Sequence, residues 1–167
     1  MPHSFKKSLE ISERHADDPI WEDLYKTAFH NFSGMQKVGV DGWAQRGGID
    51  RVITLSSGKT LTIDEKVREK DYGDILLEFW SNEEKRIPGW IAKDLACDFI
   101  AYAILPIRKC YLLDFQLLRK AWRENHKEWV TKYKIAKAKN IGYTTISVCV
   151  PVEVLFKSIK NASIVNF

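Results

Sequence analysis

Residues 48–68 read GIDRVITLSSGKTLTIDEKVR, and this stretch decides the fold. Polar and apolar residues alternate on both sides of Gly58, which is the pattern of two antiparallel strands joined by a tight turn. We predict a β-hairpin with a three-residue loop, Ser57–Gly58–Lys59, in which Gly58 supplies a positive φ. This register gathers the apolar side chains of both strands on one face, which the protein can bury. Those side chains are Ile53, Leu55, Leu61 and Ile63.

The opposite face of the hairpin is polar. The predicted register sets Asp50 opposite Lys66 and Val52 opposite Asp64, whereas a two-residue turn would set Asp50 opposite Glu65. Paired carboxylates are hard ligands that suit Mg²⁺, and the metal would polarise a phosphoryl oxygen and acidify a bound water. Lys66 would orient or deprotonate that water, or stabilise charge on the phosphate. The alternative is an ordinary cross-strand ion pair on a solvated face.

The acid-x-lysine triplet is weak evidence by itself. It occurs twice, as Asp64–Glu65–Lys66 and as Glu83–Glu84–Lys85, and this composition yields about two such triplets by chance. The position of the first triplet strengthens the evidence, because it lies on the second strand of the hairpin and Asp50 lies on the first strand. Glu22 lies at the edge of the apolar stripe of a preceding helix.

Further elements surround the hairpin in the predicted order. Asp17–Asp18–Pro19 starts a helix of about 15 residues, and residues 33–48 form a glycine-containing loop. The order predicts an α/β (α+β) chain with a single mixed sheet flanked by helices, in one domain over residues 1–167. The later elements are a strand near Asp74–Trp80, a helix at Trp90–Tyr102, a strand at Cys110–Leu113, a helix capped by Asp114, a strand at Tyr143–Val150 and a helix opened by Pro151.

Asp50 followed by Asp64-x-Lys66 on a hairpin, after a helix that carries Glu22, resembles the PD-(D/E)XK (restriction-endonuclease-like) nuclease superfamily. The resemblance implies a core of helix, three strands, helix and strand over residues 18–113, with residues 114–167 as a basic helix and a strand-helix extension. It implies a Mg²⁺- or Mn²⁺-dependent DNA endonuclease in which Asp50 and Asp64 bind metal and Lys66 is catalytic. Glu22 would be an accessory ligand, and a homodimer would cut both strands.

Two features of the motif depart from the superfamily. No proline precedes Asp50, and Glu65 stands where members carry an apolar residue. Either Arg51 pairs with Glu65 on the apolar face, or Glu65 rather than Asp64 is the working carboxylate. Glu78 and Gln45 are further accessory candidates, Gln45 because it lies in a glycine-rich lead-in to Asp50 that also resembles the superfamily.

The positive charge of the chain is local. The formal net charge is +4, and residues 119–139 hold eight basic residues against two glutamates. We predict that this stretch binds backbone phosphates of DNA without reading sequence, with RNA as an open alternative. The other explanation is a solvated lysine-rich helix face. The predicted contacts are Arg46, Arg119, Lys120, Arg123, Lys127, Lys132, Lys134, Lys137 and Lys139.

Composition excludes several classes. Apolar residues make up 45% of the chain and charged residues 29%, which is typical of a globular protein. The longest apolar run, Phe99–Ile107, is too short to span a bilayer, and the first residues do not resemble a secretory signal. Three scattered cysteines predict reduced thiols in a cytoplasmic protein. The remaining alternatives to a nuclease are a catalytically inactive nucleic-acid-binding module and a structural or interaction protein.

Overall fold

The computed structural model describes residues 11, 14–39, 44 and 46–167. Three helices and ten strands build the described fold, together with a short 3₁₀ turn at Leu105–Ile107. The helices are α2 (Ile20–Ala28), α4 (Phe115–Lys132) and α5 (Val152–Ser158). The strands are β1 (Phe32–Lys37), β2 (Arg51–Leu55), β3 (Thr60–Arg68), β4 (Asp74–Asn82), β5 (Ile87–Pro88), β6 (Phe99–Ile104), β7 (Lys109–Asp114), β8 (Ile135–Asn140), β9 (Tyr143–Pro151) and β10 (Ala162–Asn166).

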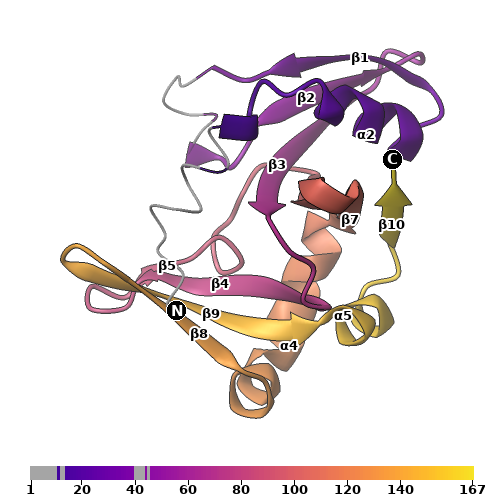
Figure 1. Ribbon diagram of the computed structural model, residues 1–167. Coiled ribbons are helices and arrows are strands. Elements are labelled where there is room, and N and C mark those ends of the chain that lie inside the picture. Colours follow the sequence, from indigo (N-terminus) through magenta and orange to yellow (C-terminus); the bar gives the residue numbers. More distant parts are fainter. Residues whose placement is uncertain (1–10, 12–13, 40–43, 45) are drawn as a thin grey trace.

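The strands form two sheets (Figure 1). The six-stranded sheet has the order β1-β2-β3-β6-β7-β10 and is mixed, because β3 and β6 are parallel while its other pairs are antiparallel. The four-stranded sheet, β5-β4-β9-β8, is antiparallel throughout. The predicted α+β class is therefore confirmed, but the prediction of a single sheet is wrong. After β3 the chain enters the second sheet, where β4 pairs with β9 from far along the sequence.

The hairpin forms with a register two residues away from the predicted one. Arg51 pairs with Ile63 and Ile53 with Leu61, and the three-residue loop is Ser56–Ser57–Gly58. Gly58 has the expected positive φ, at 82°. The loop has the predicted length but starts one residue earlier, which shifts the pairing by two. Because strand side chains alternate with a period of two, this shift leaves every side chain on its predicted face.

The predicted helix at Trp90–Tyr102 is wrong. Turns and loop occupy residues 89–98, and Phe99–Ile104 is the strand β6 at the centre of the six-stranded sheet. Tyr102 faces one hydrophobic core while Ala101 and Ala103 face the other. A strand buried on both faces shows a continuous apolar run, which periodicity alone does not separate from a buried helix. The second helix of the implied superfamily core is absent from the described segment between β3 and β6.

Other boundaries differ because pairing partners lie far away in sequence. Helix α2 has nine residues rather than about 15. At its start, the Asp18 Oδ1 accepts a hydrogen bond from the Ile20 N–H at 3.0 Å. The predicted loop at residues 33–48 includes most of β1, and β8 and β10 were not predicted. The predicted strand at Tyr143–Val150 and the helix after Pro151 are confirmed. Asp114 caps α4 by accepting from the Leu117 N–H at 3.0 Å, also as predicted.

Two hydrophobic cores enclose the six-stranded sheet. Helix α2 packs on one face through Trp21, Leu24 and Tyr25. The other face packs against the four-stranded sheet, α4 and α5. Figure 1 shows this arrangement, with α2 on the far side of the six-stranded sheet from the four-stranded one. Among the described residues, no helix is long and apolar enough to cross a membrane.

Candidate functional site

Asp50, Asp64 and Lys66 lie on the face of the hairpin that is opposite to α2. The Lys66 Nζ donates to Asp64 Oδ1 at 2.8 Å, and the Asp50 Oδ2 accepts the backbone N–H of Glu65 at 2.7 Å. The Asp64 side chain is only 5% exposed, whereas 31% of the Lys66 side chain is exposed. The hairpin therefore gathers two carboxylates and an ammonium, as predicted, with a buried aspartate under a partly accessible lysine. We call this group the Asp50–Asp64–Lys66 cluster.

Asp64 is a buried carboxylate with one oxygen that lacks a hydrogen-bond partner. That oxygen is the buried Oδ2. Burial raises the pKa of Asp64 to about 7, and neighbouring Asp50 adds to the rise while Lys66 opposes it. An unpartnered buried polar atom costs free energy, so its retention points to a ligand or to a chemical role.

Lys66 remains a cation in this setting. Burial favours the neutral amine, but the attraction and hydrogen bond of Asp64 outweigh it, and the pKa of Lys66 lies above its ordinary value. The Lys66 Nζ also lies 5.8 Å from the centroid of the Trp90 ring. A lysine held charged at neutral pH donates hydrogen bonds and stabilises anions.

Glu78 approaches the cluster from the other sheet. It lies on β4, and Lys66 and Lys93 both act on its charge. Burial raises the pKa of Glu78, while the two lysines and a hydrogen bond from the Trp90 backbone oppose the rise. Close packing fixes its backbone, because a Cβ on Gly89 would lie 2.2 Å from the Glu78 carbonyl oxygen. Of the accessory candidates that the structure describes, Glu78 is the one whose charge interacts with Lys66.

Glu65 lies on the opposite face of β3 and contacts Arg51 and Tyr25. The Arg51 Nε donates to Glu65 Oε1 at 2.6 Å, and the Tyr25 hydroxyl donates to the same oxygen at 2.7 Å. Burial raises the pKa of Glu65 against the opposing effect of Arg51. Of the two alternatives stated for this residue, pairing with Arg51 is the one that the structure shows. Glu65 therefore links Tyr25 of α2 to Arg51 of β2.

Glu22 is not gathered into the cluster. Glu22 lies on α2, on the other side of the six-stranded sheet, and pairs with Lys26 at 2.7 Å. The expectation that it joins a metal site with Asp50 and Asp64 therefore does not fit the fold. Arg46 is exposed, and Gln45 lies outside the described residues.

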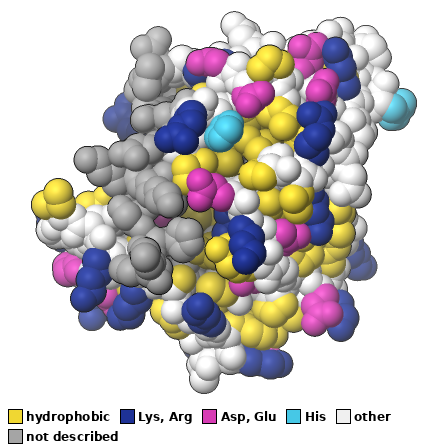
Figure 2. Space-filling model, in the orientation of Figure 1, with side chains coloured by type: hydrophobic (Ala, Val, Ile, Leu, Met, Phe, Trp, Pro, Cys, Tyr) yellow, Lys and Arg dark blue, Asp and Glu magenta, His cyan; other side chains and the backbone are white. Residues whose placement is uncertain are grey.

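The basic stretch is divided between two elements. Arg119, Lys120, Arg123, Lys127 and Lys132 lie on α4, while Lys137 and Lys139 lie on β8, with Lys134 immediately before it. Helix α4 packs against the β4 side chains that alternate with Glu78, as the 5.8 Å stacking of Phe79 on Trp122 shows. Four of these cations already pair with acids: Arg119 with Asp94, Lys120 with Glu124, Lys132 with Glu128 and Lys137 with Glu83. In the view of Figure 2, basic and acidic side chains are interspersed rather than separated.

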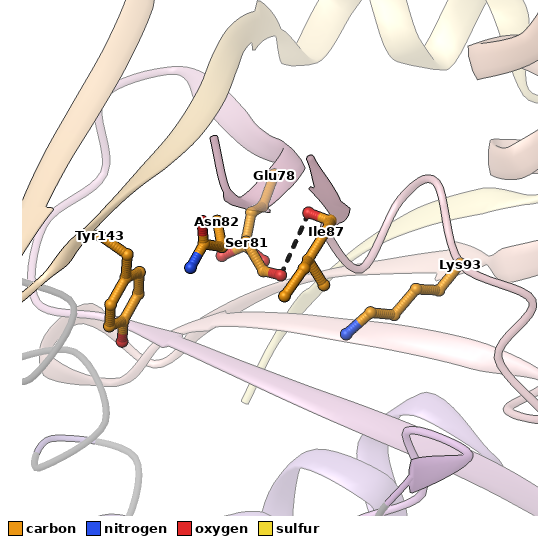
Figure 3. Close-up of a pocket in the computed structure, with 6 residues that line it drawn as sticks. All are labelled: Glu78, Ser81, Asn82, Ile87, Lys93 and Tyr143. Carbon is orange, nitrogen blue, oxygen red and sulfur yellow. Dashed lines mark hydrogen bonds between the residues drawn. The ribbon is translucent and has the colours of Figure 1, made fainter. Parts of the chain in front are cut away.

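Glu78 also lines a pocket of about 360 Å³, to which Asp50, Asp64 and Lys66 do not contribute. Figure 3 shows its lining, with Lys93 on one side and Tyr143 on the other. The Ser81 hydroxyl donates to the backbone at Ile87, and Asn82 Oδ1 accepts the Lys85 N–H at 2.8 Å, which leaves the Asn82 amide nitrogen as a donor. The sequence did not identify Ser81, Asn82 or Tyr143, because only the pairing of β4 with β9 brings them together. Nothing in the local pattern signals that pairing.

The carboxylates of the cluster are the residues that could hold the divalent metal that the motif implies. Among the described residues, no group of three or more His, Cys, Asp or Glu side chains is arranged to hold a metal ion. Mg²⁺ commonly uses only one or two carboxylates and completes its shell with water and phosphate oxygens. Asp50 and the unpartnered oxygen of Asp64 fit that smaller requirement.

Comparison with known proteins adds no relative to this picture. No family model matches the chain, and no curated protein matches it significantly. The chemistry of the cluster and of its surroundings is therefore what indicates a function.

Proposed function

We propose that this protein is a divalent-metal-dependent nuclease of the PD-(D/E)XK type that hydrolyses phosphodiester bonds of DNA. The observation that carries the proposal is the unpartnered, buried Oδ2 of Asp64 beside Asp50 and Lys66. A simple surface ion pair would leave both partners solvated and would contribute little to stability. Here a carboxylate is buried at a cost, next to a second carboxylate and a permanent cation.

The roles follow from the geometry of each side chain. Asp50 and Asp64 would hold Mg²⁺ or Mn²⁺, which when bound polarises a phosphoryl oxygen and acidifies a water. The Glu65 N–H orients the Asp50 carboxylate, so that its other oxygen remains available for a ligand. Asp64 would hold the metal through its unpartnered Oδ2, while its Oδ1 keeps the hydrogen bond from Lys66.

Lys66 would act as a hydrogen-bond donor rather than as a base. Its raised pKa keeps the ammonium protonated at neutral pH. An ammonium in a partly buried site stabilises the charge that develops on the phosphate as the water attacks. Glu78 faces Lys66 from β4 and would position that ammonium or a metal-bound water.

Cleavage of supercoiled plasmid and of labelled oligonucleotides in Mg²⁺, Mn²⁺ or EDTA tests the proposal. Asp64→Asn and Lys66→Gln remove one charge each from the cluster. The second acid-x-lysine triplet provides matched controls, because Glu83→Gln and Lys85→Gln make the same chemical changes on exposed residues. The expected result is metal-dependent cutting that falls by at least a hundredfold in the two cluster variants and stays unchanged in the controls.

Two outcomes would overturn the proposal. Cutting that survives Asp64→Asn and Lys66→Gln at the wild-type rate would exclude the cluster as the reacting site. Absence of cutting on every substrate, with DNA still bound, would identify the protein instead as a binding module.

A further inference from the structure

β10 (Ala162–Asn166) is an edge strand of the six-stranded sheet, and in the part of the chain that the structure describes it pairs with β7 alone. Figure 1 shows β10 at the margin of that sheet. An edge strand presents a row of unpaired backbone N–H and C=O groups, which can pair with a strand of another chain. The way in which an edge is protected therefore indicates whether it is open to a partner.

The other three sheet edges carry the ordinary forms of protection. Proteins prevent unwanted pairing with lysines, prolines, bulges or very short strands at their edges. β1 has a register shift near its start and ends at Lys37. β5 has only two residues, of which one is Pro88, and β8 carries Lys137 and Lys139. Each of these edges is therefore unsuited to pairing with another chain.

β10 has none of these features. Its five residues read ASIVN, so the strand contains neither a charged residue nor a proline. Its register against β7 runs from Ala162 to Asn166 without a bulge. At its centre, Ile164 presents an apolar side chain that is 47% exposed. Among the sheet edges that the structure describes, β10 is therefore the one that lacks protection.

The outward-facing backbone groups of β10 follow from its hydrogen bonds to β7. In an antiparallel pair, residues that bond across the ladder alternate with residues whose N–H and C=O point away from it. The Asn161 carbonyl accepts a β7 N–H at 3.1 Å, and the Phe167 N–H donates to the Arg108 carbonyl at 3.0 Å. Counting by twos from these two ends, the odd-numbered residues bond β7. The residues that direct their N–H and C=O away from the sheet are therefore Ala162, Ile164 and Asn166.

Side-chain contacts anchor both ends of β10. At its start, the Asn161 Nδ2 donates to Asp114 Oδ2 at 3.2 Å. At its end, the Arg108 guanidinium donates to the Phe167 carbonyl and lies 5.2 Å from the centroid of the Phe167 ring. Arg108 also pairs with Asp23 of α2 at 2.9 Å. The outward groups are therefore held in an extended row before a partner arrives, which lowers the entropic cost of binding.

We propose that the β10 edge binds the β10 edge of a second copy of this chain, in antiparallel orientation about a two-fold axis at Ile164. The outward residues are spaced symmetrically about Ile164, so Ile164 pairs with its own copy and Ala162 pairs with Asn166 of the partner subunit. Every outward N–H and C=O then finds a partner, as a self-complementary interface requires. The two Ile164 side chains meet at the centre and bury their exposed apolar surface.

A second copy is the partner that the edge fits by symmetry. It brings the same spacing of outward groups, and neither β10 contributes a charge that opposes the pairing. The pairing joins the two six-stranded sheets into one continuous sheet. This inference depends on the edge and not on the proposed function.

Sedimentation velocity of the full chain over a range of concentrations measures the association. One pair of short strands is a small interface, so we expect a dissociation constant on the order of 10 µM. Ile164→Lys places like charges directly opposite each other and should raise that constant at least about tenfold. Ile141→Lys makes the same chemical change at a side chain that is 96% exposed between β8 and β9, and should leave the constant unchanged. Circular dichroism verifies that both variants are folded.

Amide hydrogen exchange separates this dimer from any other. The N–H groups of Ala162, Ile164 and Asn166 should gain protection as the concentration rises, whereas those of Ser163 and Val165 should be protected throughout because they bond β7. A chain that stays monomeric far above the expected constant, or a dimer that Ile164→Lys leaves intact, would overturn the proposal. A dimer that adds no protection at Ile164 would overturn it as well. Neither measurement involves nucleic acid, so the result is independent of the cleavage test.

Discussion

Replacing Asp64 with asparagine is expected to stabilise the protein at alkaline pH while removing its activity. Asparagine has the shape of the protonated aspartate and keeps an oxygen that Lys66 can bond. In the wild-type protein above neutral pH, the Asp64 carboxylate is charged and its buried Oδ2 has no hydrogen-bond partner. The variant carries no charge at this position at any pH.

The magnitude follows from the pKa of Asp64. Its value rises from 3.8 to about 7 on folding, and each unit corresponds to about 1.4 kcal/mol. The folded state therefore binds a proton that the unfolded chain has already released between pH 4 and 7, and stability declines as the pH rises through that window. The total loss is about 4 kcal/mol, complete above pH 8, and already includes the attraction of Lys66. The free energy of unfolding of the asparagine variant does not fall in this way, because the variant has no carboxyl group at position 64 to ionise.

Urea and thermal unfolding at pH 4.5, 6 and 8 in EDTA measure the difference. The variant should match the wild type at pH 4.5 and exceed it by up to about 4 kcal/mol at pH 8, or roughly 10 °C in melting temperature. Asp17→Asn is the control, because the Asp17 side chain is 83% exposed and the substitution should change little. A variant that is equally stable or less stable than the wild type at pH 8 would refute the assignment of a destabilising charge to Asp64.

Four further outcomes are expected. Gly89→Ala should lower the free energy of unfolding in urea by about 1–3 kcal/mol or more, because the added Cβ would clash with the Glu78 carbonyl. Gly34→Ala should be tolerated, because a Cβ there would point into open space. Asp114→Ala should cost about 1 kcal/mol by removing the cap of α4, and a larger loss would indicate a further role. Arg51→Met should cost about 3–5 kcal/mol in the same assay, because the buried Glu65 carboxylate loses its cation and keeps only the Tyr25 hydroxyl, while plasmid cutting by the folded variant should stay intact. If the proposed function holds, Mg²⁺ should raise the melting temperature of the wild type at pH 8 and not that of the asparagine variant.

Local patterns predicted the features that depend on neighbouring residues. Alternation separated the two hairpin faces, and the same alternation correctly placed Glu65 away from Asp64 and beside Arg51. The cap at Asp114 and the strand at Tyr143–Val150 also followed from nearby residues. In contrast, the register and the identity of β6 were predicted wrongly. Both depend on what packs against a strand, since a two-residue slip preserves the faces and a doubly buried strand has no polar period.

The sequence by itself determined that Asp50, Asp64 and Lys66 share one polar face, because side-chain direction in a strand follows from the count of residues along it. Tertiary structure alone decided how deeply Asp64 is buried, that Glu22 lies across the sheet, and that Glu78 approaches Lys66 from the second sheet. The physical reason is that burial and approach are set by pairings between distant segments, such as β4 with β9, whose free energy arises only when the whole core assembles.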